Sequence, residues 1–177
     1  MTTLGYSHLA ICVADLDRGV EFYTQVFGFT AGIPYKSAGH RVAALMESEA
    51  LSFGGTFLRL GDNLVELLAY SPVRVPGSAP RRADEVGYAH ISLVVDDIDA
   101  AVAAVEQHGG TRRTRFEIAF ADGCTVIVFV TDPDGNRVEL IWHSTDAERR
   151  GHAAYLGLTG PGWPAAGLAP DIAAGPA

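Results

Sequence analysis

Cysteine is scarce in this chain. Only two occur among 177 residues, Cys12 and Cys124, and they lie far apart in the sequence. Small domains that depend on disulfides carry a much denser set of cysteines, usually in an oxidising compartment. We therefore expect two free, buried thiols in a reducing compartment and no disulfide framework.

Positive charge is also in short supply. Lys and Arg number 13 against 21 Asp and Glu, which gives a formal net charge of −8. The Arg pairs at 81–82, 112–113 and 149–150 are separated from one another. Because a protein that binds a nucleic-acid backbone needs clustered cations, this composition argues against a nucleic-acid partner.

Long apolar runs are absent. No stretch approaches the about 20 apolar residues that a membrane-spanning helix needs. The first residues, MTTLGYSHLAICV, also lack the basic start and long apolar stretch of a secretory signal. We expect a cytoplasmic protein with no membrane partner. Apolar residues still make up 48% of the chain, enough for the core of one ordinary domain or of two small modules.

What the chain does contain is an internal repeat. The segment YSHLAICVADLDRGVEFY (6–23) aligns with YAHISLVVDDIDAAVAAV (88–105). Each copy combines a β-rich run with an Asp-capped amphipathic run, and an apolar hairpin follows later in the chain. We therefore predict an α+β fold built from two paired βαβββ modules.

The modules are predicted to span residues 4–71 and 88–145. A stretch rich in Pro and Gly at 72–87 indicates a linker, and an Ala/Gly/Pro-rich tail occupies 146–177. The first module carries extra residues. We place them in segment 38–53, whose composition favours a short helix or a lid-like loop over a strand.

Two carboxylates interrupt apolar strands at matching places. Glu66 lies in NLVELLAYS (63–71) and Glu139 lies in NRVELIWH (136–143). Because side chains alternate between the faces of a strand, each Glu points away from its apolar neighbours. A single Glu of this kind is more often a solvated residue, but the recurrence in both modules favours a common role.

Two histidines repeat in the same way, because His8 and His90 begin the first strand of each copy. If the open faces of the two modules form one half-barrel cleft, His8, Glu66, His90 and Glu139 converge there. Buried carboxylates without a partner are costly. A divalent metal bound by nitrogen and oxygen ligands resolves this cost, and Ni, Co, Zn, Mn and Fe are all compatible with the donor set.

The chain resembles the vicinal oxygen chelate superfamily of glyoxalase, bleomycin-resistance and dioxygenase proteins. The segments HLAICVADLDRGVEFYTQVFGF (8–29) and TVIVFVTDPDGNRVELI (125–141) are most similar to bacterial glyoxalase I, with methylmalonyl-CoA epimerase close to it. The resemblance implies metal ligation by His8, Glu66, His90 and Glu139. It also implies proton abstraction next to a chelated carbonyl, with Glu66 or Glu139 as the base, and a homodimer.

The sequence departs from glyoxalase I where that family holds glutathione. The family carries an Arg four residues after its first His and an Asn four residues after its first Glu, and here these positions are Cys12 and Tyr70. A thiol and a phenol do not bind a carboxylate through paired, charged hydrogen bonds as Arg does. We predict a more apolar substrate pocket, lined by Cys12, Tyr70, Ser92 and His143. A CoA thioester, an aromatic polyketide-like compound or another small oxygenated molecule would suit it.

Three functions follow from these residues. The first is a metal-dependent isomerase, epimerase or lyase of the glyoxalase type. The second is an Fe(II)-dependent oxygenase of an aromatic or phenolic substrate, and the third is a non-catalytic drug-binding resistance protein. The sequence leaves open whether the modules pair within one chain or exchange between two chains.

Overall fold

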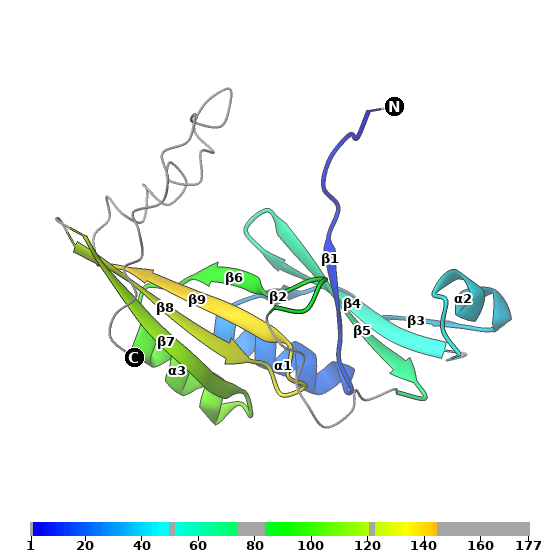
Figure 1. Ribbon diagram of the computed structural model, residues 1–177. Coiled ribbons are helices and arrows are strands. Elements are labelled where there is room, and N and C mark those ends of the chain that lie inside the picture. Colours follow the sequence, from blue (N-terminus) through cyan, green and yellow to red (C-terminus); the bar gives the residue numbers. More distant parts are fainter. Residues whose placement is uncertain (1, 50–51, 74–83, 121–122, 145–177) are drawn as a thin grey trace.

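The computed structural model describes residues 2–49, 52–73, 84–120 and 123–144 (Figure 1). The predicted tail at 146–177 and most of the predicted linker lie outside these residues. The first module comprises β1 (Leu9–Cys12), α1 (Leu16–Phe27), β2 (Thr30–Ala31), β3 (Tyr35–Ala38), α2 (His40–Leu45), β4 (Ser52–Leu60) and β5 (Asn63–Ser71). The second comprises β6 (Ile91–Val94), α3 (Ile98–Gln107), β7 (Thr111–Phe120), β8 (Gly123–Thr131) and β9 (Arg137–His143).

Each module forms its own sheet, and the two sheets share one topology. The first has the strand order β1-β5-β4-β2, with β3 also paired to β4, and the second has the order β6-β9-β8-β7. In both, the first strand runs parallel to the last, which places Ala10 opposite Glu66 and Ser92 opposite Glu139. The predicted α+β fold of two paired βαβββ modules is confirmed.

The helix ends follow from the capping residues that the sequence predicted. The Asp15 carboxylate accepts a hydrogen bond from the Arg18 backbone amide at 2.9 Å, which begins α1, and Gly28 ends it with a φ of 71°. Asp97 caps α3 in the same way. In the ambiguous segment 38–53, the helical expectation is confirmed by α2. Among the described residues no helix is long and apolar enough to span a membrane.

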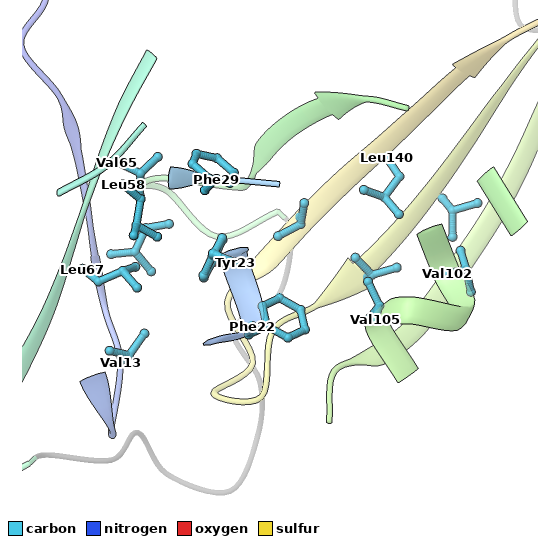
Figure 2. Close-up of a cluster of buried hydrophobic side chains, with 14 of the residues drawn as sticks. Val13, Phe22, Tyr23, Phe29, Leu58, Val65, Leu67, Val102, Val105 and Leu140 are labelled. Carbon is cyan, nitrogen blue, oxygen red and sulfur yellow. The ribbon is translucent and has the colours of Figure 1, made fainter. Parts of the chain in front are cut away.

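A single apolar core lies between the two sheets. Figure 2 shows side chains from both modules meeting around Phe22 and Tyr23 of α1. Val65 and Leu67 enter this core from the first sheet, and Leu140 enters it from the second. Helices α1 and α3 contact each other, and each also contacts its own sheet. Each sheet therefore has an inner face on the core and an outward face, which we call its open face.

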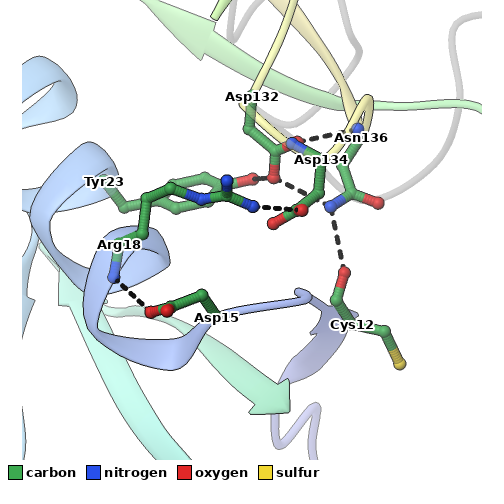
Figure 3. A network of polar contacts seen from close by, with 7 residues as sticks. All are labelled: Cys12, Asp15, Arg18, Tyr23, Asp132, Asp134 and Asn136. Carbon is green, nitrogen blue, oxygen red and sulfur yellow. Dashed lines mark hydrogen bonds and ion pairs between the residues drawn. The ribbon is translucent and has the colours of Figure 1, made fainter. Parts of the chain in front are cut away.

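A partly buried polar cluster joins the modules at the turn between β8 and β9 (Figure 3). The Tyr23 hydroxyl donates to Asp132 at 3.2 Å, and Arg18 pairs with Asp134 at 2.5 Å. The Asn136 amide donates to the Asp132 carboxylate at 2.8 Å and to the Cys12 carbonyl at 3.1 Å. The turn after β8 is thus hydrogen-bonded to both β1 and α1 of the first module.

Candidate active site

The first module brings His8 and Glu66 together. The Nε2 atom of His8 lies 3.2 Å from Oε2 of Glu66, and the two side chains are 33% and 14% exposed. The edge of the His8 ring packs on Phe57, with the ring centroids 5.2 Å apart. Phe57 pairs directly with Glu66 across the β4–β5 ladder. Both polar groups therefore lie on the open face, above an aromatic side chain.

The second module repeats this arrangement. The Nε2 atom of His90 lies 3.5 Å from Oε2 of Glu139, with exposures of 32% and 16%. The His90 ring packs on Phe129 at 5.3 Å, and Phe129 pairs with Glu139 across the β8–β9 ladder. We call each His–Glu pair a half-site. The repeat seen in the sequence is thus a repeat of local geometry as well.

The two half-sites do not meet within one chain. Across residues 2–49, 52–73, 84–120 and 123–144, no three His, Cys, Asp or Glu side chains gather closely enough to hold a metal ion. Each half-site offers one imidazole nitrogen and one carboxylate oxygen, a donor set that suits a divalent metal. The residues therefore fit a metal as two separate halves of one site. The common core turns the two open faces away from each other.

Tyr35 belongs to the first half-site, although the sequence analysis did not single it out. Its hydroxyl donates a hydrogen bond to Oε1 of Glu66. Burial and this bond to Glu66 raise the pKa of the Tyr35 phenol well above its usual range, so the phenol stays a donor. One feature of the sequence could have indicated this contact. Two glycines inside an apolar strand, Gly54 and Gly55, indicate that another group approaches the strand closely.

The predicted pocket residues of the first module lie on its open face. Tyr70 packs its ring on Phe53 with centroids 5.5 Å apart. Burial, together with the charges of Cys12 and Glu66, raises the pKa of Tyr70. Cys12 is a free thiol at the end of β1, and Cys124 is also free, so the expectation of two free thiols is confirmed. The expectation that both are buried is wrong, because Cys12 is exposed on the open face and Cys124 is only half-buried. A cavity of about 240 Å³ at the seam between the modules has Cys12 and His90 among its lining residues.

The two predicted pocket residues of the second module lie in different surroundings. Ser92 is exposed and stands directly opposite Glu139 in the β6–β9 ladder. His143 is buried, and its Nδ1 lies 2.9 Å from the Thr125 hydroxyl. It is four residues beyond Glu139, about 13 Å along an extended strand. The structure therefore brings Ser92 to the half-site and places His143 at the far end of the same face.

Comparison with known proteins decides the family. The sequence profile of the Glyoxalase/Bleomycin resistance protein/Dioxygenase superfamily matches residues 5–140. The chain belongs to this superfamily. The resemblance predicted from the sequence is thereby confirmed.

Relatives with curated names narrow the comparison. A lactoylglutathione lyase of Haemophilus influenzae is 33% identical over 134 residues, which cover 76% of this chain and 89% of the relative. A lactoylglutathione lyase of Escherichia coli O157:H7 is 30% identical over the same shares of the two chains. This similarity supports a glyoxalase-like function for this protein.

Solved structures agree on the fold. A glyoxalase family protein of Bacillus cereus superimposes with a TM-score of 0.68 at 16% identity, covering 81% of this chain and 96% of that one. The fosfomycin resistance protein FosX of Mesorhizobium loti gives a TM-score of 0.50 at 22% identity, covering 84% and 98%. At these identities the likeness concerns the fold alone.

Proposed function

We propose that this protein is a divalent-metal-dependent enzyme of the glyoxalase type, an isomerase, epimerase or lyase. It would abstract a proton next to a carbonyl of a small oxygenated substrate. The observation that carries the proposal is the recurrence of one His–Glu pair, with the same supporting Phe, on the open faces of both modules. A partly exposed His–Glu ion pair adds little stability, so stability alone is a weak reason for both modules to keep it.

His8, Glu66, His90 and Glu139 would hold the metal, which could be Ni, Co, Zn, Mn or Fe. When bound, such an ion acts as a Lewis acid that polarises a carbonyl and stabilises the negative charge that develops on its oxygen. Glu66 and Glu139 are the carboxylates positioned to take the proton from the carbon next to that carbonyl. In the complete site the apolar residues around them would exclude water from the reacting carbon.

The complete site is proposed to form between two copies of the chain. The common core turns the half-sites outward, so the first half-site of one copy would face the second half-site of its partner. The same open faces expose large apolar side chains, with Phe57 37% and Phe116 47% exposed. Covering these side chains would favour association. Of the two pairings left open by the sequence, this geometry supports exchange between chains in a homodimer.

The substrate is proposed to carry an apolar or aromatic group. Beside Glu66 the open face presents four aromatic side chains in mutual contact, namely Tyr35, Phe53, Phe57 and Tyr70. Cys12 and Tyr70 occupy the places where glyoxalase I holds glutathione. The relatives named lactoylglutathione lyase act on lactoylglutathione by name. This chain is better suited to a CoA thioester or an aromatic ketol.

The test joins metal analysis to a screen for proton exchange. Protein purified without chelators should contain a stoichiometric divalent metal, and it should exchange a substrate hydrogen with deuterated solvent. The screen would include lactoylglutathione, α-hydroxyketones, CoA thioesters and aromatic ketols. Protein without metal, and without restored binding when metal is added, would refute the proposal. Oxygen uptake that requires Fe²⁺ would identify an oxygenase instead, and tight drug binding that survives His8→Ala would identify a resistance protein.

A further inference from the structure

The two half-sites differ at one position. In the first module, Tyr35 pairs with Gly55 across the β3–β4 ladder and its hydroxyl reaches Glu66. In the second module, Phe129 matches Phe57, so Ile127 stands where Gly55 stands. The partner of Ile127 is Phe116, which has no hydroxyl. Among the described residues, His90 is the polar partner that the structure gives to Glu139.

Gly55 is what allows Tyr35 to reach the carboxylate. A Cβ atom at position 55 would lie 2.6 Å from the Tyr35 hydroxyl oxygen and 2.7 Å from the ring carbon that bears it. Real Cβ atoms do not approach other atoms so closely, so the phenol crosses β4 through space that only glycine leaves open. The equivalent Ile127 fills that space in the second module. The contact with Glu66 therefore depends both on the Tyr35 phenol and on the absence of a side chain at Gly55.

The Tyr35 ring is also held in place. It stacks on Phe57 with centroids 6.2 Å apart and an interplanar angle of 30°. Phe53 meets it edge-on at 6.1 Å. These ring contacts restrict the rotation of the phenol before any ligand arrives. Glu66 is held from two sides, because Oε1 accepts from Tyr35 while Oε2 faces His8.

We propose that Tyr35 is a positioning residue that fixes the Glu66 carboxylate in the orientation in which it binds the metal. This inference rests on the proposed function. A hydrogen-bonded support of this kind orients a ligand, and its loss commonly lowers metal affinity by about 10- to 100-fold. In the second half-site Phe116, which has no hydroxyl, stands at the position that matches Tyr35, so Glu139 lacks this particular support. Of the two carboxylates, Glu66 is the one anchored by a phenol from the neighbouring strand.

The experiment measures Zn²⁺ affinity of the full chain by competition with a chromophoric chelator. Tyr35→Phe should bind Zn²⁺ about 10- to 100-fold more weakly than the wild type. The matched control is Tyr6→Phe, which removes a phenol that is 76% exposed and should leave the affinity unchanged. Gly55→Ala keeps the phenol but displaces it, so it should weaken binding in the same direction. Combining Gly55→Ala with Tyr35→Phe should cost less affinity than the two separate losses added together.

A spectroscopic readout separates positioning from a general effect on folding. At saturating Co²⁺, the visible absorption bands of Tyr35→Phe should shift relative to the wild type, whereas those of Tyr6→Phe should not. Thermal unfolding of the metal-free proteins shows whether each variant is folded. If Tyr35→Phe is not folded, the metal affinity and the Co²⁺ spectrum of Gly55→Ala decide the question. Wild-type affinity and an unchanged Co²⁺ spectrum in the folded variants would overturn the role of Tyr35. Failure of the wild type itself to bind metal would overturn the proposed function instead.

Discussion

At the scale of single residues, the four side chains of the half-sites differ from ordinary surface charges in what surrounds them. Glu66 and Glu139 are 14% and 16% exposed, yet each lies beside an imidazole. A carboxylate so sheltered from water is stabilised by hydrogen bonds or by a nearby positive charge. Each imidazole packs on a phenylalanine that holds the ring against the carboxylate. Each pair therefore has the arrangement that the proposed metal site requires.

The first prediction concerns His8. Replacing His8 by Ala should lower metal affinity by more than the roughly 10- to 100-fold caused by losing a hydrogen-bonded support of a ligand. The fold should survive, because the His8 side chain is 33% exposed and lies outside the core. Isothermal titration with Zn²⁺ measures the affinity, and circular dichroism checks the fold.

His40→Ala is the matched control, since His40 is exposed at the start of α2. Its metal affinity should equal that of the wild type. If His8→Ala retained wild-type affinity as well, His8 would not be a ligand.

Whether the position of a side chain could be predicted from the sequence depended on how far apart in the chain its contacts lie. The alternation of Val65, Glu66 and Leu67 is local, and it correctly predicted which side chains enter the core and which face outward. Tyr35 is different, because its contact with Glu66 requires β3 to pair with β4 in one register. That pairing depends on the placement of three strands and not on any local pattern.

At the scale of elements, the turn between β8 and β9 also connects the second module to α1 of the first module. Asp132 at its start is only 2% exposed, and its carboxylate accepts from the backbone amides of Asp134 and Asn136 at 2.9 and 2.8 Å. The same carboxylate accepts from Tyr23 of α1. The run Asp-Pro-Asp-Gly at 132–135 has the residue types of a turn. The contact with α1 could not be foreseen, because it depends on how the two modules pack.

The second prediction follows from Tyr23. Burial first, and then the charge of Asp132, raise the pKa of the Tyr23 phenol well above 10.0. In the unfolded chain the phenol ionises near pH 10, while in the folded protein it stays protonated to higher pH. The stability that it contributes is therefore complete below pH 10 and is lost as the pH rises towards the raised pKa. Tyr23→Phe should show a shallower loss of stability in this alkaline range.

Urea unfolding at pH 8 and at pH 10.5 or above measures this effect. At pH 8 the variant should be less stable by about 1 kcal/mol, the usual worth of one hydrogen bond. The gap between the two proteins should narrow at the higher pH. An unchanged gap would show that the Tyr23–Asp132 bond does not couple stability to pH.

At the scale of the whole molecule, the packing of α1 against α3 sets the directions of the two open faces. The sequence predicted two modules and left their pairing open, because both pairings use the same strands and helices. Within one chain the modules share a core, because side chains such as Phe22, Leu67 and Leu140 gather between the sheets, and this supports the proposed exchange of half-sites. The proposed site then requires a second copy of the chain.

The third prediction tests that requirement by complementation. His8→Ala and His90→Ala homodimers should each lack intact sites. When the two variants are unfolded together and refolded as a mixture, about half of the dimers contain one copy of each, and one of their two sites has all four ligands. Metal content should then recover to about a quarter of the wild-type value.

Refolding each variant alone is the control and should recover no metal. If the four ligands came from one chain, every site in the mixture would lack a histidine and no recovery would occur. That result would contradict the exchange of half-sites between chains.

The outward direction of the half-sites has a consequence for how activity responds to dilution. An enzyme whose site is complete within one chain keeps the same specific activity at any concentration. Here a lone chain would hold two incomplete sites, so specific activity should fall once the protein is diluted below the dissociation constant of its dimer. A bound metal bridging two copies would lower that constant, and supply of the metal would then govern how much of the protein is assembled.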